Sequence, residues 1–323
     1  MKIAVTGGAG YIGSVCVELL CESGHEVVVI DNLSEGHRAA VDSRARLEVA
    51  DLAETGRLTE ILRDHATEAV IHYAAYALVG ESMSDPGKYY RNNVGGGLSL
   101  LEAMVAAQVP KIVFSSTCAT YGIPESVPID ESVPQRPVNP YGHSKLTFEC
   151  MLHWFGEAHG LSSVMFRYFN AAGASRQFGE HHRIETHLIP NVLFAAQGRR
   201  KEIEIYGTDY DTPDGTAVRD YVHVSDLAEI HKQAVEEDVT GAFNLGTGQG
   251  HSVREVIEAC AKAAGREIPV RDCPRRPGDP PVLVAATGKA VREWGWAPRF
   301  SDLEKTVRSA WEWHEAHPEG YAD

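Results

Sequence analysis

The sequence contains no hydrophobic stretch long enough to cross a membrane. None of its apolar runs approaches the roughly 18–20 consecutive residues that a membrane-spanning helix requires. The opening segment reaches Thr6 after the apolar residues Ile3, Ala4 and Val5, which is too short for the core of a secretory signal peptide. These absences predict a protein that is neither membrane-bound nor secreted.

Cysteine is scarce, and its spacing follows no pattern. The six cysteines include neither a Cys-x-x-Cys pair nor a regular disulfide framework. Cys16 and Cys21 fall in a segment with helical periodicity, where a buried, reduced thiol is the common state. A disulfide-stabilised secreted scaffold is therefore excluded, and the sequence favours a cytoplasmic location.

Positive charge is also in short supply. The 323 residues include 45 acidic and 30 basic side chains, which gives a formal net charge of −15 at pH 7. Such a chain repels a phosphate backbone, so general binding to nucleic acid is excluded. An anionic small-molecule substrate must instead be held by a local group of arginine or lysine residues.

The first half of the chain alternates between short apolar runs and segments with helical periodicity. The runs lie at residues 3–5, 27–30, 47–49, 69–71, 111–114 and 164–166, and the longest helical patterns lie at about 85–107 and 142–158. Short apolar runs separated by helices are typical of buried parallel strands in βαβ units. We predict an α/β fold with a doubly wound parallel sheet (Rossmann-type) of six or seven strands.

The alternation breaks beyond about residue 170. Glycine, proline and charge become more frequent, and helical patterns at 188–198, 252–264 and 302–316 are joined by long loops. Long loops in a compact enzyme tend to carry binding functions. We predict a first domain over residues 1–170 and a smaller, less regular α/β domain over residues 171–323.

A glycine-rich turn follows the first apolar run. Gly7, Gly10 and Gly13 form a G-x-x-G-x-x-G pattern, and a helical segment begins directly after it. Glycine permits a tight turn and a close approach of the backbone to a pyrophosphate, while the following helix directs its free N–H groups at the phosphates. Alone, this pattern could also serve simple packing between a strand and a helix.

An acidic residue at the end of the second apolar run supports the ligand-binding interpretation. Asp31 lies 18 residues after Gly13, where a carboxylate accepts hydrogen bonds from the adenosine ribose and repels a 2′-phosphate. The alternative is that Asp31 only caps a turn. Asp51, after the third run, is placed to meet the adenine. Together these features predict that residues 1–170 bind NAD rather than NADP.

A second pattern supplies groups for proton transfer. Tyr141 and Lys145 form the only Y-x-x-x-K pair in the chain, and their spacing places both side chains on one helix face. Ser115 and Thr117 follow the run at 111–114, at the carboxyl end of a predicted central strand, where doubly wound folds bind ligands. Beside a nicotinamide, these groups would form a proton-transfer site for hydride chemistry. We expect Lys145 and the positive nicotinamide ring to lower the pKa of the Tyr141 phenol.

With these motifs the chain resembles the UDP-glucose (UDP-galactose) 4-epimerases of the extended short-chain dehydrogenase/reductase superfamily. The resemblance runs from end to end. It rests on VTGGAGYIGS (5–14), DNLSEG (31–36), VGES (79–82), YYRNNVGG (89–96), FSSTCATYG (114–122), NPYGHSK (139–145), FRYFNAAGA (166–174), GTDYDTPDGTAVRDYVHVSDLA (207–228), NLGTG (244–248) and RRPGD (275–279). The long segment at 207–228 is far more specific than the glycine-rich or Y-x-x-x-K patterns.

The resemblance implies a role for each matching residue. Tyr141 would exchange a proton with the sugar 4-hydroxyl, Lys145 would bind the nicotinamide ribose and tune Tyr141, and Thr117 would help to move the proton. Residues 171–323 would bind the nucleotide sugar. The implied cofactor contacts are Gly7, Gly10, Tyr11, Ile12, Gly13, Asp31, Asn32, Asp51, Leu52, Tyr73, Ala74, Ala75, Asn92, Ser115, Tyr141, Lys145 and Tyr168. The implied substrate contacts are Thr117, Tyr141, Asn170, His187, Leu188, Tyr206, Arg219, Arg276, Asp279 and Leu283.

The same resemblance implies the reaction and the assembly. NAD would accept a hydride from C4 of a UDP-sugar, the flat 4-keto sugar would turn, and the hydride would return to its other face. Arg219 and Arg276 would neutralise the diphosphate, which meets the need for local cations in an acidic protein. The family commonly forms homodimers through the helices predicted at 88–107 and 142–158, so we expect a homodimer.

Three positions depart from the family pattern: a lysine is missing before VGES, His187 stands where some members have asparagine, and Thr117 replaces the commoner serine with the same hydroxyl. Many members carry lysine before VGES, whereas Tyr76, Ala77 and Leu78 supply none, so one contact to a cofactor ribose is absent and NAD is expected to be held less tightly. Leu283 lies where a large aromatic residue restricts the sugar pocket and a small residue opens it to a 2-N-acetyl group. Acceptance of N-acetylated UDP-sugars therefore stays open.

Histidine and tryptophan offer two further candidate sites. His181, His182 and His187 suggest a metal, but with no acidic or cysteine partner at ligand spacing they are interpreted as surface histidines or, for His187, as a hydrogen-bonding group near the uracil. We therefore predict no metal site. Four tryptophans between residues 294 and 313 are predicted to pack in the core rather than to stack on bases.

Other functions use the same fold. A sugar 4,6-dehydratase needs an Asp-Glu pair beside the hydroxyl residue for its elimination step. In this chain Thr117 is followed by Cys118 and Ala119, which cannot supply that acid and base. A non-catalytic NAD sensor is disfavoured because Tyr141, Lys145 and Thr117 are all retained. A 4-epimerase that acts mainly on another UDP-sugar, such as an N-acetylhexosamine, a pentose or a uronate, stays open.

Overall fold

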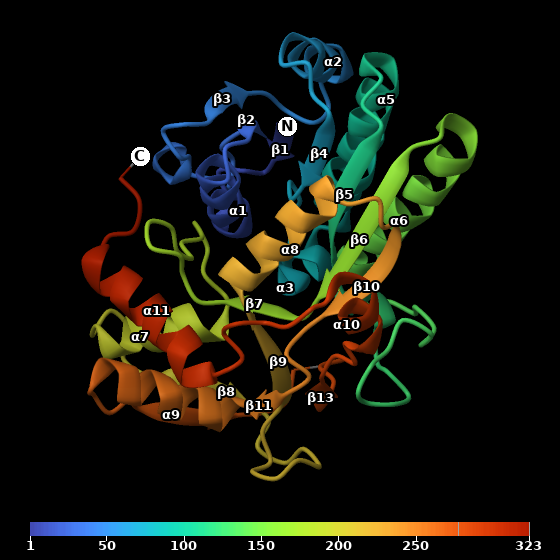
Figure 1. Ribbon diagram of the computed structural model, residues 1–323. Coiled ribbons are helices and arrows are strands. Elements are labelled where there is room, and N and C mark those ends of the chain that lie inside the picture. The colour runs from blue at the N-terminus through green and yellow to red at the C-terminus, as the bar shows by residue number, and fades with distance from the viewer. Residues whose placement is uncertain (277, 323) are drawn as a thin grey trace.

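The protein is organised around a parallel sheet of seven strands. The computed structural model describes residues 1–276 and 278–322, so Pro277 of the RRPGD segment and Asp323 lie outside the description. The strand order is β10-β6-β5-β4-β1-β2-β3, and every neighbouring pair is parallel. The strands are β1 (Lys2–Thr6), β2 (Glu26–Asp31), β3 (Arg46–Val49), β4 (Ala69–His72), β5 (Lys111–Thr117), β6 (Ser162–Tyr168) and β10 (Gly241–Leu245). The predicted doubly wound α/β sheet is confirmed (Figure 1).

The strand order reverses between β1 and β4. The chain winds outward from β1 through β2 to β3, then returns to the other side of β1 with β4, β5 and β6. Thr6 and His72 end these two central strands and share a hydrogen bond of 2.6 Å between Oγ1 and Nδ1. Connections leave on opposite faces at such a reversal, so a crevice opens above the strand ends.

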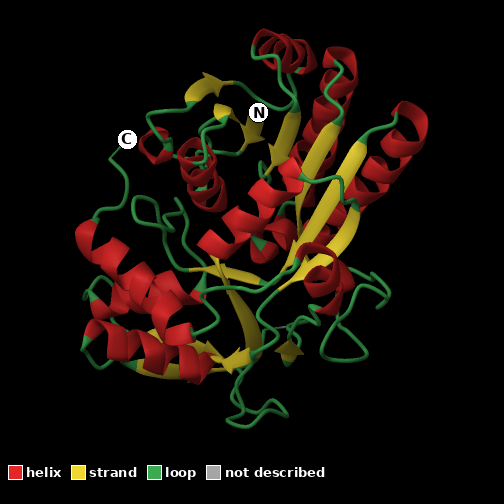
Figure 2. Cartoon of the chain, in the orientation of Figure 1, coloured by secondary structure: helices red, strands yellow, loops and turns green. Residues whose placement is uncertain are grey.

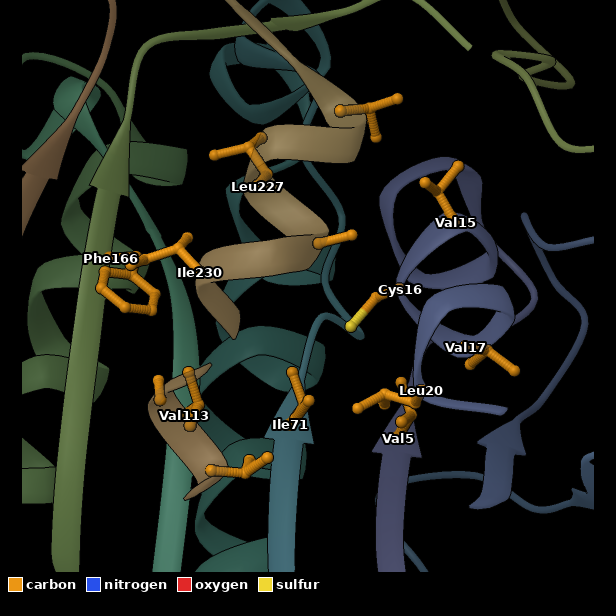
Figure 3. Close-up of a cluster of buried hydrophobic side chains, with 14 of the residues drawn as sticks. Val5, Val15, Cys16, Val17, Leu20, Ile71, Val113, Phe166, Leu227 and Ile230 are labelled. Carbon is orange, nitrogen blue, oxygen red and sulfur yellow. The ribbon is translucent and has the colours of Figure 1, made fainter. Parts of the chain in front are cut away.

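One face of the sheet is covered by α1 (Tyr11–Glu22), α8 (Val224–Glu236) and α10 (Gly288–Trp294). Figure 3 shows Val15, Cys16 and Leu20 of α1 approaching Leu227 and Ile230 of α8 above strand residues. Trp294 extends this core over Phe243 of β10, with the ring centroids 5.6 Å apart. The predicted core packing of the tryptophans is confirmed for Trp294, Trp296, Trp311 and Trp313, all of which are buried.

The opposite face is covered by α2 (Thr55–Asp64), α5 (Gly97–Ala107) and α6 (Pro140–His159). Their buried side chains, including Leu58, Leu101, Phe148 and Leu152, pack on Ala4, Val28, Ile30, Val70 and Ile112 of the strands. The sheet therefore lies between two layers of helices (Figure 2), which explains why its strands are continuously apolar.

The single helix predicted over residues 85–107 is wrong in one respect. The segment contains α4 (Pro86–Tyr89), a wide π-helical turn η2 (Tyr90–Gly96) and then α5. Three consecutive glycines end η2 and begin α5, and a Cβ on Gly97 would lie 2.6 Å from the Phe148 ring of α6. The glycines permit this close packing but favour helix weakly, so the regular helix is interrupted.

A smaller unit follows β6. Its core lies among α7 (Leu188–Ala196), α9 (Val253–Ala264) and α11 (Leu303–Ala316), which Figure 1 shows together at the lower left. The strand β9 (Val218–His223) pairs with β7 (Asn170–Ala172), β11 (Gly250–Ser252) and β13 (Val282–Leu283), while β8 (Ile203–Tyr206) pairs with β12 (Val270–Cys273). Short elements complete the chain at η1 (Arg38–Ala40), α3 (Val79–Ser84) and η3 (Cys118–Tyr121).

The two predicted domains share structure. α8 and β10 lie beyond residue 170 in the sequence, yet they belong to the helical layer and the edge of the principal sheet. The division into residues 1–170 and 171–323 stays a prediction about binding roles. Within the described residues, no helix combines the length and apolar character that crossing a bilayer requires. All six cysteines are free thiols.

Buried histidines generate a prediction about acid stability. His231 lies among the rings of Tyr73 and Phe166, and burial lowers the pKa of its imidazole to about 4. Below about pH 6.5 this histidine binds a proton in the unfolded chain but not in the folded one. The free energy of unfolding therefore decreases as the pH is lowered from about 6.5 to 4. The contribution of one such histidine is about 2 kcal/mol at pH 5.

We expect His231→Phe to keep the ring packing and to remove this titration. Its free energy of unfolding should fall by about 2 kcal/mol less than that of the wild type between pH 7 and pH 5. Urea denaturation at both pH values measures the difference. Equal losses in the two proteins would contradict the prediction.

Candidate active site

A cavity of about 1520 Å³ opens above the carboxyl ends of the central strands. Pockets for a single small ligand usually occupy roughly 300–1,000 Å³, so this cavity has room for two large ligands side by side. Both halves of the chain line it. Of the predicted site residues, all of which are described, every one except Asp51 lies in its wall: Gly7, Gly10, Tyr11, Ile12, Gly13, Asp31, Asn32, Leu52, Tyr73, Ala74, Ala75, Asn92, Ser115, Thr117, Tyr141, Lys145, Tyr168, Asn170, His187, Leu188, Tyr206, Arg219, Arg276, Asp279 and Leu283.

The glycine-rich turn forms one wall of the cavity. Gly7 has a φ of +71°, and a Cβ there would lie 2.5 Å from the backbone nitrogen of Ala74. A Cβ on Gly13 would lie 2.2 Å from the carbonyl oxygen of Gly7. Gly10 precedes α1 and has no side chain to cap the helix, so the start of α1 is left open to a ligand. This cradle fits the pyrophosphate of a dinucleotide.

Asp31 lies at the end of β2, on the wall of the cavity. Its Oδ2 accepts a hydrogen bond from the Ala9 N–H at 3.1 Å, and its Oδ1 accepts one from the Leu33 N–H at 2.8 Å. Asp31 therefore does cap the turn, as the alternative interpretation holds. Because each carboxylate oxygen has two acceptor sites, capacity for ribose hydroxyls remains. Asp51 does not line the cavity itself, and its Oδ2 accepts a hydrogen bond of 2.7 Å from Asn32 Nδ2, which does.

The start of α6 positions the predicted proton-transfer groups. Asn139 caps the helix by accepting the Gly142 N–H at 2.8 Å, and Pro140 occupies the first turn. Tyr141 and Lys145 then face the end of β5. Lys145 Nζ donates to the Ser115 carbonyl oxygen at 2.8 Å and lies 4.8 Å from the centre of the Phe114 ring.

Burial is the main influence on the pKa of Tyr141 in the protein alone. Burial raises the pKa of its phenol to about 12, and a hydrogen bond with Thr117 only partly opposes the rise. Burial also lowers the pKa of the Lys145 ammonium to about 7, against the attraction of Glu149. Desolvation therefore dominates the pKa of Tyr141 among the protein's own groups. The lowering expected from Lys145 together with the positive nicotinamide ring stays a prediction for the NAD-bound protein.

Sequence reasoning missed the buried network under Lys145. Glu149 is nearly inaccessible and pairs with Arg167, with 2.6 Å between Oε2 and Nη2. The hydroxyl of Ser116 donates to Glu149, and Arg167 Nη1 donates to the Tyr121 hydroxyl at 2.9 Å. Glu149 continues the four-residue spacing of Tyr141 and Lys145 on one face of α6, which is a signal that could have revealed it.

The opposite end of the cavity carries the predicted substrate residues. Arg219 of β9 forms an ion pair with Asp279, and the guanidinium of Arg276 lies 4.0 Å above the Tyr206 ring. Leu188 begins α7, and Leu283 ends β13. The two arginines provide the local positive charge that the acidic composition requires of an anion-binding site.

The histidine segment differs from its interpretation as isolated surface groups. His187 Nδ1 lies 3.0 Å from carboxylate oxygens of both Glu180 and Glu185, and His182 Nε2 lies 3.2 Å from Glu180. The absence of an acidic partner was therefore a wrong inference from the sequence. Each histidine follows a glutamate by two positions, so the repeated Glu-x-His pattern was available as a signal.

Comparison with known proteins identifies the family. Residues 3–246 match the model of the NAD dependent epimerase/dehydratase family. The chain belongs to this family. A family relative, the UDP-glucose 4-epimerase of Lacticaseibacillus casei, is 49% identical, and the alignment covers 100% of this chain and 99% of that protein.

Solved structures of family members agree with the fold over the whole chain. The UDP-glucose 4-epimerase from Brucella ovis in complex with NAD has a TM-score of 0.93 and 48% identity, covering 96% of this chain and 97% of that one. The enzyme from Bifidobacterium longum in complex with NAD⁺ and UDP has a TM-score of 0.95 and 38% identity, covering 99% and 100%.

The glycine-rich turn generates a prediction. We expect Gly13→Ala to lose bound NAD, because the new Cβ would overlap the Gly7 carbonyl oxygen that shapes the cradle. The measurement is the NAD released from purified protein on denaturation. Gly56→Ala is the matched control, since a Cβ at that position in α2 meets no atom within 4 Å. Full NAD content in Gly13→Ala would contradict the role given to this turn.

Proposed function

We propose that the protein is an NAD-dependent nucleotide-sugar 4-epimerase that interconverts UDP-glucose and UDP-galactose. One observation carries the proposal: the glycine-rich turn, the Tyr141–Lys145 pair and the Arg219–Arg276 pair all face one cavity. The first set suits a dinucleotide, the second a proton transfer, and the third a diphosphate. Full-length similarity to UDP-glucose 4-epimerases supports the same activity.

The glycine-rich turn and Asp31, on one wall of the cavity, would hold the cofactor. Gly7, Gly10 and Gly13 leave backbone space for the pyrophosphate, and the open start of α1 directs its N–H groups there. Asp31 would accept the adenosine ribose hydroxyls and exclude a 2′-phosphate. When bound, NAD⁺ supplies reversible hydride acceptance, which converts the sugar C4 into a ketone and allows the hydride to return to the other face.

Tyr141 would exchange the proton of the sugar 4-hydroxyl. Its phenol is buried against Thr117, whose hydroxyl provides a partner for the moving proton. Lys145 is fixed by the Ser115 carbonyl and stabilises negative charge on the phenol. Because burial raises the pKa of Tyr141 to about 12, loss of its proton depends on additional positive charge in the closed cavity.

The second half of the chain would hold the UDP portion. Arg219 and Arg276 would pair with the diphosphate, and Asp279 would accept a hydroxyl of the uridine ribose. Leu188 and Tyr206 offer apolar contact for the uracil. These anchors lie away from Tyr141 along the chain and leave the sugar free to turn within the large cavity.

The sugar preference depends on the wall near Leu283. This side chain is intermediate in size between the aromatic and the small residues of the family pattern, so a 4-epimerase with a different preferred UDP-sugar is the alternative. Conversion rates of the N-acetyl, pentose and uronate analogues measured beside UDP-galactose would rank them. A non-catalytic NAD sensor would convert none.

We further propose a homodimer in the cytoplasm. Leu98 of α5 and Trp154 of α6 are exposed apolar side chains, with Trp154 67% accessible, on the helices that the family pairs. Free thiols at all six cysteines suit a reducing compartment. Sedimentation equilibrium should give twice the mass of the 35.3 kDa chain, and Trp154→Glu should shift the equilibrium toward monomer. A monomeric wild type would contradict the assembly.

The activity is tested with purified protein and UDP-galactose without added NAD. We expect UDP-glucose to form, since the cofactor is regenerated in each cycle. Tyr141→Phe should lower turnover by about 10²–10⁴-fold while it retains NAD, because only the transferable proton is lost. Tyr90→Phe removes a hydroxyl outside the cavity and is the control. Unchanged turnover in Tyr141→Phe would refute the assignment of the base.

A further inference from the structure

Four side chains after Gly179 converge on one point. Glu180, His182, Glu185 and His187 each offer one ligand atom, and these atoms all lie within 4.8 Å of one another. Three of the separations are 3.0, 3.0 and 3.2 Å. Tetrahedral zinc with bonds of about 2.0–2.2 Å places its ligand atoms roughly 3.3 Å apart. The three short separations are therefore close to those of a four-coordinate metal centre, and any separation near the 4.8 Å limit has to shorten when an ion binds.

An independent feature of the cluster points to a missing ligand. The Glu185 side chain is only 5% exposed, and its Oε2 has no hydrogen-bond partner. A buried carboxylate oxygen without a partner is costly, and a cation is the usual compensation. Glu180 is also buried, with a side chain 7% exposed. Glu185 therefore presents a buried acceptor that the surrounding protein does not satisfy, beside the buried carboxylate of Glu180.

We propose that Glu180, His182, Glu185 and His187 form a zinc site in the wall of the active-site cavity. Two imidazoles and two carboxylates match the ligand types of zinc, whereas magnesium and calcium prefer an all-oxygen set. All four residues line the cavity, so an ion can enter from solvent. The fourfold protein ligation marks a structural centre, since a catalytic zinc keeps one position open.

The ion would organise the segment that joins the two ends of the cavity. His187 immediately precedes α7, whose first residue Leu188 lies in the predicted uracil site. His182 packs edge-on against Tyr11 of the glycine-rich turn, with the ring centroids 6.2 Å apart. A metal that links Glu180 to His187 would fix the loop between these two contacts. It would thereby hold the start of α7 at a constant position relative to the glycine-rich turn.

A proton offers a partial alternative to the metal. His187 Nδ1 lies 3.0 Å from a carboxylate oxygen of both Glu180 and Glu185, so a protonated imidazole can bridge the two glutamates. This arrangement leaves Glu185 Oε2 without a partner. It also supplies one positive charge beside two carboxylates, whereas a zinc ion supplies two. Zinc would displace the proton from His187 and satisfy both glutamates together.

The experiment measures zinc on the purified holoenzyme. Protein dialysed against chelator is titrated with Zn²⁺ in competition with a chromophoric chelator of known affinity, and bound metal is counted after gel filtration. We expect one zinc per chain and a rise in melting temperature on zinc addition. Mg²⁺ at the same concentration should neither bind nor shift the melting temperature. Absence of zinc binding, or equal binding of Mg²⁺, would overturn the proposal.

Variants locate the site. His182→Gln removes one ligand from a partly exposed position and should weaken zinc binding on the order of 10–100-fold or more, with the melting-temperature shift abolished. Glu180→Gln is the second variant, with folding checked by circular dichroism. His153→Gln removes an exposed histidine of α6 and should bind zinc as the wild type does. Equal zinc affinity in His182→Gln and His153→Gln would overturn the assignment. Zinc binding is read without turnover, so its result is separate from that of the epimerase assay.

Discussion

The reversal of strand order between β1 and β4 determines where polar groups can gather in this protein. Away from the reversal the central strands are enclosed between two apolar layers of helices. Above the reversal the connections diverge, and the sheet edge is left open. Thr6 and His72 close the base of this crevice with one hydrogen bond, and the glycine-rich turn, β5 and α6 build its walls. Every predicted site residue in the first half except Asp51 lines this opening.

The protonation of the side chains in this crevice depends on desolvation as much as on neighbouring charges. Burial drives Tyr141 and Lys145 toward their neutral forms, in opposite directions on the pH scale. Glu149 opposes the lowering of the Lys145 pKa, and Arg167 in turn forms an ion pair with Glu149 within the core. The proton-transfer groups are therefore supported by a buried ion pair that lies next to Lys145 on α6.

Sequence patterns revealed most of this arrangement, and the exceptions have physical causes. Periodicity predicted the parallel sheet, because strands buried on both faces must be apolar throughout. Motif spacing predicted the cradle and the Tyr141–Lys145 pair. It could not reveal how far burial raises the pKa of Tyr141, since burial is a property of the packed structure. It also missed the hydrogen bond from Asn32 to Asp51 and the π-helical turn at Tyr90–Gly96. The carboxylates beside His182 and His187 were missed too, although the repeated Glu-x-His spacing indicates them.

The return of β10 to the principal sheet has a consequence for how the chain is made. β6 pairs with β10 along its outer side, and β10 lies after most of the smaller unit in sequence. As the polypeptide leaves the ribosome, β6 keeps an unpaired edge until residues 241–245 emerge. An open edge beside an apolar sheet invites association with other nascent chains. A fragment that stops near residue 170 would lack β10 and keep that edge unpaired, so the second half of the chain protects the first half from association as well as supplying the substrate wall of the cavity.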